Sequence, residues 1–193
     1  MKKELPIYKM LISESSEDKT EVNYVALVDD PAIQMMWQKF DKQKEFSFQA
    51  DKERNIITGV LMVADLPIYR RDERMGEYYV VFDKENIEKA AIKYFKKGYM
   101  HNVNLMHDSK AVVDGVFMFE SFLVDSKRGI QSPKGFEGLP DGSWVASYKV
   151  ENLLLWDKLE SFNGFSVEGL FGYELEMTED EKVIKKIIKQ IHS

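Results

Sequence analysis

Short apolar runs, each broken by glycine, proline or charged residues, recur along the chain and restrict it to a fold built largely from strands. The run at 56–63 is typical, because its residues are β-branched or apolar around Gly59, which predicts a buried strand with a bulge or a close backbone approach. The runs predict strands at 22–28, 46–48, 56–63, 78–82, 103–107, 144–150 and 164–171, with a long strand or bent pair at 112–124.

Helical patterns are fewer. Asp83 can cap a helix whose apolar residues follow at helical spacing until Gly98 ends it. A second helix is predicted over 151–162. A capping box at 178–181 introduces a third, whose apolar stripe consists of Val183, Ile184, Ile187, Ile188 and Ile191. Because strands and helices follow no strict βαβ rhythm, we expect an α+β fold, with a mainly antiparallel sheet or small β-barrel flanked by helices.

Length and charge limit the classes of protein. With 193 residues, of which 44% are hydrophobic, the chain suits a single domain whose residues 1–53 are less regular and whose residues 179–193 form the terminal helix. The net charge of −6 disfavours nucleic-acid binding. The absence of cysteine excludes disulfides and thiolate catalysis. We expect no membrane span and no secretory signal, which fits a cytoplasmic location.

Two polar segments interrupt the strand pattern. Residues 67–74 are predicted to be a loop that carries Arg70, Arg71 and Arg74. Residues 126–143 contain repeated glycine and proline, which predicts a long, mobile loop of the kind that covers a substrate site.

Ser166 is the first candidate for chemistry. On a strand, Phe165 and Val167 would point to the core, whereas Ser166 and Glu168 would share the opposite face. The flanking Gly164 and Gly169 would let another backbone come close. An outward-facing polar residue on an ordinary strand explains the pattern equally well, and the spacing does not match the Gly-x-Ser-x-Gly nucleophile elbow.

His107 is the second candidate, because a serine needs a neighbouring base to become a nucleophile. On a strand it would share a face with Val103 and Leu105 and be partly buried, which could fix one tautomer. A structural histidine is the alternative. A metal pair with His101 lacks a third ligand at suitable spacing, and His192 is expected to be solvated.

A carboxylate that orients the histidine would complete the site. Glu120 is our first choice, because a carboxylate inside the apolar run 112–124 needs a partner and that run follows the His107 strand. Glu168, on the face of Ser166, is the second choice, whereas Asp108 would point to the face opposite His107.

Several segments together resemble the XkdF-like phage serine proteases, which are grouped with prohead maturation proteases related to herpesvirus assemblin. The resemblance spans nearly the whole chain, and its order and spacing are more specific than any one segment. The segments are Tyr24–Ile33, Gly59–Arg70, Asn104–Asp108, Glu120–Phe122, Gly142–Trp144, Leu155–Trp156 and Gly164–Gly169.

The resemblance implies an assemblin-like serine endopeptidase with His107 as base and Ser166 as nucleophile, but it does not supply the third residue, for which Glu120 stays a physical choice. It implies an oxyanion held by backbone N–H groups and an arginine, with Arg70 and Arg128 as candidates. The expected partners are phage scaffold and major capsid proteins and a second copy of the chain, inside proheads in the host bacterial cytoplasm. No cofactor and no metal are expected. A non-catalytic prohead core or scaffold protein with the same fold is the alternative.

Overall fold

In the part of the chain that the structure describes, the protein consists mainly of strands arranged in three open sheets of four strands each. The computed structural model describes residues 5–29, 31 and 47–175. The first sheet has the order β12 (Gly172–Leu175), β1 (Ile7–Leu11), β6 (Gly76–Val81), β5 (Ile68–Asp72). The second has the order β3 (Gln49–Asp51), β4 (Ile56–Met62), β10 (Trp144–Val150), β9 (Val116–Leu123). The third has the order β11 (Gly164–Leu170), β2 (Glu21–Val28), β7 (Val103–Leu105), β8 (Asp108–Val112).

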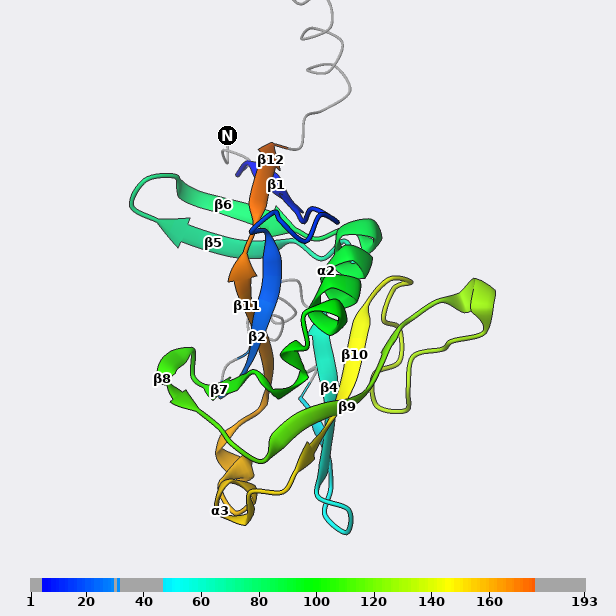
Figure 1. The fold of residues 1–193 in the computed structure, drawn as a ribbon. Helices are drawn as coiled ribbons and strands as arrows, with labels where there is room; N and C mark the ends of the chain where they lie inside the picture. Colours follow the sequence, from blue (N-terminus) through cyan, green and yellow to red (C-terminus); the bar gives the residue numbers. More distant parts are fainter. Residues whose placement is uncertain (1–4, 30, 32–46, 176–193) are drawn as a thin grey trace, which may run out of the picture.

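Most neighbouring strands are antiparallel, as expected, and the exceptions are the parallel pairs β1–β6 and β2–β7. The sheets surround one main core and do not close on themselves, so the small barrel that the sequence allowed is wrong (Figure 1). The few helices make the fold mainly β while remaining compatible with α+β. Within the described residues, none of the helices is both long and apolar enough to cross a bilayer.

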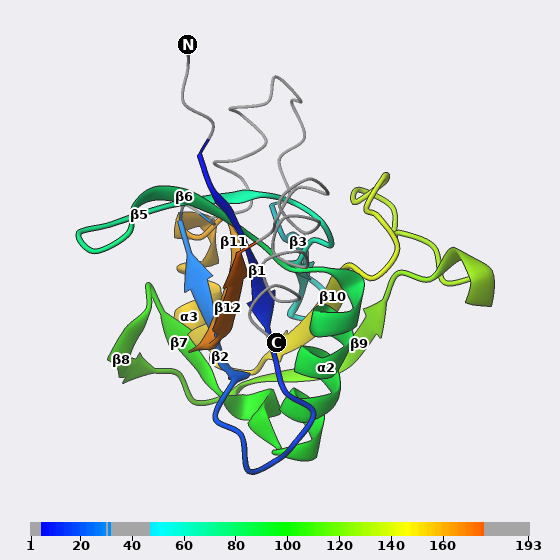
Figure 2. The same ribbon diagram turned by 90° about the horizontal axis from the view of Figure 1, so that it is seen from above.

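The predicted first helix is confirmed as α2 (Lys84–Lys96). Asp83 caps the helix by accepting a hydrogen bond from the backbone N–H of Asn86. Beyond its C-terminal end, Gly98 adopts a left-handed conformation with a φ of 74°. Its apolar side, which includes Ile87 and Tyr94, packs into the core beside β2 and β10 (Figure 2).

Other predicted elements differ from the structure. The polar segment 67–74 contains β5, an edge strand with three exposed residues, and the run 112–124 divides between β8 and β9 at a turn containing Gly115. The predicted helix 151–162 is reduced to α3 (Leu153–Trp156) and the 3₁₀ turn η3 (Leu159–Ser161). Of the predicted strand 46–48, residues 47 and 48 belong to no strand and β3 begins at Gln49, while residue 46 lies outside the described residues.

The long loop 126–143 does not lie over Ser166. Phe136 and Leu139 are buried in a second, smaller apolar cluster with Val60, Val124 and Val145, against the sheet that contains β4 and β10. Figures 1 and 2 show this loop to the side of α2, well away from β11. The expectation of a lid beside the substrate site is therefore wrong, because two apolar side chains anchor the loop elsewhere. The helix predicted at 179–193 lies outside the described residues.

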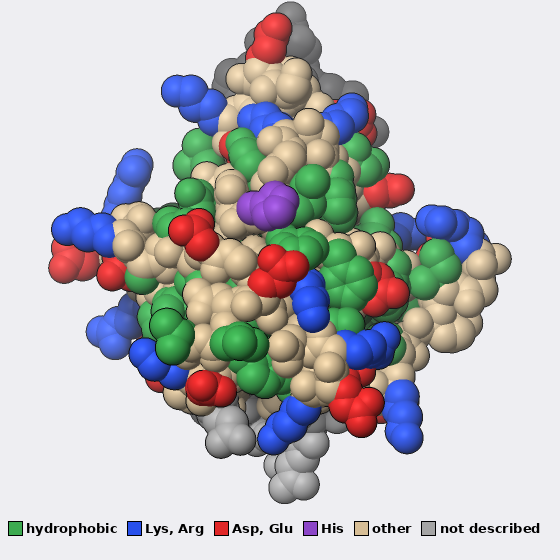
Figure 3. Space-filling model, turned by 60° about the horizontal axis from the view of Figure 1, so that its bottom comes forward, with side chains coloured by type: hydrophobic (Ala, Val, Ile, Leu, Met, Phe, Trp, Pro, Cys, Tyr) green, Lys and Arg blue, Asp and Glu red, His purple; other side chains and the backbone are tan. Residues whose placement is uncertain are grey.

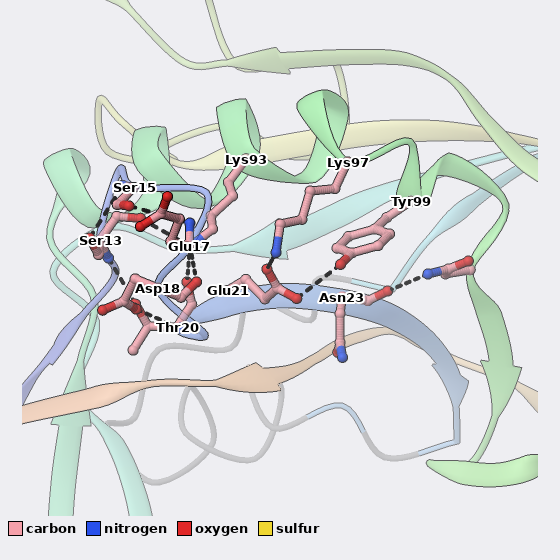
Figure 4. A network of polar contacts seen from close by, with 11 residues as sticks. Ser13, Ser15, Glu17, Asp18, Thr20, Glu21, Asn23, Lys93, Lys97 and Tyr99 are labelled. Atoms are coloured by element: carbon pink, nitrogen blue, oxygen red, sulfur yellow. Dashed lines mark hydrogen bonds and ion pairs between the residues drawn. The ribbon is translucent and has the colours of Figure 1, made fainter.

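A buried lysine joins α2 to the connection between β1 and β2. Lys93 is only 3% exposed, and its ammonium donates to the carbonyl oxygens of Ser13, Asp18 and Thr20 at 3.3, 2.8 and 2.8 Å (Figure 4). One turn later, Lys97 and Tyr99 bind the carboxylate of Glu21. Burial alone would raise the pKa of Glu21, but these two partners hold it below its usual value.

We expect Lys93→Met to lower the free energy of unfolding by about 3 kcal/mol, because three carbonyl groups would lose their donor. The melting temperature should then fall by roughly 6–12 °C for a chain of this size. Lys96→Met on the same helix is the matched control, since Lys96 is exposed and should leave the melting temperature nearly unchanged. Equal thermal shifts for the two variants would contradict the role given to Lys93.

Candidate active site

Ser166 lies in a row of side chains that crosses three strands of the third sheet. In this sheet Ser166 is opposite Ala26 on β2, and Ala26 is opposite Asn104 on β7. Residues opposite each other share a face, so Ser166 and Asn104 flank the small side chain of Ala26. Phe165 is buried on the other face, in the core, as the sequence predicted.

Glu168 follows Ser166 on the same face of β11 and contacts His107. One oxygen of Glu168, Oε1, lies 3.1 Å from Nδ1 of His107 and accepts a hydrogen bond of 2.6 Å from Nδ2 of Asn104. Asn104 is almost fully buried, whereas the side chains of His107 and Glu168 are 45% and 27% exposed. The carboxylate is thus fixed from inside the protein by Asn104 and meets an accessible imidazole outside.

Ser166 and His107 therefore lie on one face of one sheet, with Glu168 as their common neighbour. Ser166 and His107, which are both described, form no hydrogen bond with each other in this structure. The pairing of nucleophile and base is accordingly part of the proposal below. Asn104 was not predicted as a site residue from the sequence, although it lies only three residues before His107.

His107 is not on a strand, which corrects the sequence-based expectation. Leu105 and Asp108 pair across a turn whose two central residues, Met106 and His107, have φ of 53° and 60°. Two positive φ values define a type I′ hairpin turn, which strongly prefers Asn-Gly. Methionine is unfavourable at a positive φ, and histidine, although tolerated there better than most residues, suits the turn less well than glycine. Unfavourable backbone conformations concentrate at functional sites.

The turn gives a prediction in which stability and activity change in opposite directions. Replacing Met106-His107 by Asn-Gly should raise the free energy of unfolding by about 1–2 kcal/mol, because the new residues suit the left-handed conformation. Thermal unfolding measures this gain, and it should accompany complete loss of any hydrolysis that depends on His107. A less stable double variant would show that Met106 and His107 are not strained in this turn.

Glu120, the first choice for orienting the histidine, lies elsewhere. It is exposed on β9 in the second sheet, where its carboxylate accepts a hydrogen bond of 2.8 Å from Ser147. Glu120 has a polar partner, as expected for a carboxylate in this run, but the partner is not His107. The reason is that β9, which carries Glu120, pairs with β10, whereas the strand that follows His107 and pairs with β7 is β8. His101 is on η1 (Tyr99–His101) against the ring of Phe117, and His192 lies outside the described residues.

The two candidate arginines lie in different parts of the structure. Arg128 lies 3.8 Å from Asp125 in the anchored loop. Arg70, on β5, lines a cavity of about 240 Å³ together with Ser166 and its neighbours Phe165 and Val167. The geometry thus associates Arg70, and not Arg128, with Ser166.

Other kinds of site find less support. Among the residues that the structure describes, His, Asp and Glu side chains form no group of three that could hold a metal ion.

Figure 3 looks onto the end of the molecule that is lowest in Figure 1, where acidic and hydrophobic side chains surround an exposed histidine. Hydrophobic residues at this end include Leu153 and Leu154 of α3, which are 63% and 79% exposed.

A serine, a histidine and a carboxylate on one face of a sheet are the groups that serine hydrolases use for nucleophilic catalysis. The comparison with protein families agrees with this class. The model of the family described as "Putative phage serine protease XkdF" matches residues 43–174, about two thirds of the chain, so the chain belongs to this family. The matched range includes Asn104, His107, Ser166 and Glu168. No curated protein and no solved structure matches the chain significantly.

Proposed function

We propose that the chain is a serine endopeptidase in which Ser166 is the nucleophile, His107 the general base and Glu168 the residue that orients His107. The observation that carries the proposal is the contact of 3.1 Å between His107 Nδ1 and Glu168 Oε1, on the face of the sheet that also bears Ser166. Membership in a family described as phage serine proteases supports the reaction class, and the three residue roles rest on the geometry. Glu168 here takes the role for which Glu120 was the first choice.

The contact with Glu168 favours the neutral tautomer of His107 with its proton on Nδ1, which leaves the lone pair on Nε2. Nε2 then takes the proton of Ser166 as Oγ attacks the carbonyl carbon of the scissile peptide bond. Glu168 stabilises the imidazolium that forms. The imidazolium returns the proton to the leaving amine, and water hydrolyses the acyl-enzyme ester by the same route.

The oxyanion of the tetrahedral intermediate needs preorganised donors. Arg70 is our candidate, together with backbone N–H groups of β11, which pairs only with β2 among the described strands. Its free edge could bind a substrate chain in extended form, as sheet edges bind peptides.

The substrates in this proposal are prohead proteins, namely the scaffold, the N-terminal region of the major capsid protein and the protease's own tail. Action inside assembling proheads, in an assemblin-like manner, would confine an endopeptidase that is harmful in the host cytoplasm. The test is coexpression of the chain with the scaffold and capsid proteins of its phage, followed by mass spectrometry. Defined new termini that disappear with Ser166→Ala support the proposal. Intact partners in assembled proheads would favour a non-catalytic core protein.

A further inference from the structure

The cavity beside Ser166 lies along the edge of β11 that has no partner strand among the described residues. It touches Phe165, Ser166 and Val167, which are consecutive residues of an extended strand and so alternate between its two faces. A cavity that reaches all three residues lies beside the strand rather than above one face. β2 occupies the opposite edge of β11, so the cavity is on the side where β11 has no partner strand among the described residues.

One part of the cavity wall is apolar and deeply buried. This part includes Met10, Leu61, Val80 and Phe82, which are all nearly inaccessible to solvent. The cavity volume of about 240 Å³ corresponds to the space of roughly eight water molecules, enough for one large aliphatic side chain. An apolar recess next to a candidate nucleophile is the usual form of a site that selects one residue of a substrate.

Arg70 provides a charge in a lining whose other polar groups are the hydroxyls of Ser166, Tyr78 and Tyr173. Its guanidinium donates to the carbonyl oxygen of Tyr69 at 3.2 Å, and no carboxylate in the described part of the chain forms an ion pair with it. Partial removal of the guanidinium from water lowers the pKa of Arg70, although the residue keeps an accessible surface. A charged group in this position gains from a carboxylate supplied by a ligand.

We propose that the cavity is a specificity pocket for one bulky apolar side chain of a polypeptide bound along the free edge of β11, and that Arg70 pairs with an acidic residue adjacent to it. The inference rests on the proposed protease function for its purpose, but the binding itself does not require catalysis. It assigns to the enzyme substrates in which leucine or methionine stands next to aspartate or glutamate. The chain's own segment 174–177, Glu-Leu-Glu-Met, has this composition.

The test measures binding of fluorescent peptides to the full-length Ser166→Ala variant by fluorescence polarisation. The peptides contain Glu-Xaa-Glu, where Xaa is leucine, methionine, glycine or aspartate. We expect leucine and methionine to bind at least tenfold more tightly than glycine or aspartate, because only they fill the apolar space. Equal affinities for all four peptides would overturn the proposal.

Two substitutions locate the peptide. Val167→Phe should reduce the affinity for the leucine peptide at least fivefold by filling the cavity from its partly exposed rim. Arg70→Gln should weaken Glu-Leu-Glu about tenfold and leave Gln-Leu-Gln unchanged, whereas Arg71→Gln on the same strand should affect neither. Unfolding curves ensure that each variant is folded, and binding unaffected by both Val167→Phe and Arg70→Gln would contradict the pocket.

Failure of this inference is distinguishable from failure of the protease proposal. Selective binding of Glu-Leu-Glu without reaction of Ser166 towards a fluorophosphonate would support the pocket and contradict catalysis. Reaction of Ser166 without any preference among the four peptides would contradict the pocket alone.

Discussion

His107→Asn is expected to lower kcat/KM for peptide-bond hydrolysis on the order of 10⁴-fold, because Ser166 would lose the base that takes its proton. Asparagine is a suitable replacement, since it tolerates the positive φ of 60° at this position better than most residues. The folded structure should therefore be preserved. The measurement is the initial rate of cleavage of a capsid-derived peptide, compared with the parent protein at the same concentration.

His101→Asn is the matched control for this prediction. His101 is also accessible, but it stacks on Phe117 and has no contact with Glu168. Its replacement should leave the cleavage rate within about twofold of the parent, as expected for a surface change away from the site. Comparable losses in the two histidine variants would remove His107 from its proposed role.

Glu168→Gln is expected to lower kcat about 10²-fold with little change in KM, because the neutral amide stabilises the imidazolium of the transition state less than the carboxylate does. The amide oxygen can still accept from Asn104, so the fold should be retained. Steady-state kinetics with the same peptide separate the two parameters. An equal rise in KM with kcat unchanged would assign Glu168 to substrate binding.

Glu120→Gln completes the comparison, because it changes the carboxylate that the sequence favoured. Glu120 contacts Ser147 in another sheet, so this variant should retain a kcat within about twofold of the parent. If Glu120→Gln slows turnover and Glu168→Gln does not, the assignment of the orienting residue made here is wrong.

Local signals made parts of the fold predictable. Asp83 and Gly98 mark the two ends of one amphipathic helix in the sequence, and α2 lies between them. The alternation around Ser166 predicted which side chains of β11 face the core, and Phe165 is buried as expected. These features depend on neighbours in sequence, where periodicity and capping are informative.

The rest depends on contacts between distant residues. The parallel pairing of β2 with β7 places Asn104 in the row of Ser166, and no pattern in either strand specifies that pairing. The turn at His107 carries Met-His instead of a recognisable Asn-Gly, so its sequence favoured a continuing strand. Glu168 rather than Glu120 meets His107 for the same reason, since only the tertiary arrangement decides between two carboxylates.

The reaction of Ser166 with a fluorophosphonate tests the central claim most directly, because this reagent labels serines that a neighbouring base activates. The protein would be labelled both free and within assembled proheads, and the modified residue identified by peptide mass spectrometry. We predict one adduct, on Ser166, that is lost in His107→Asn and retained in His101→Asn. The absence of an adduct in both preparations, or an adduct on Ser166 that persists in His107→Asn, would contradict the account.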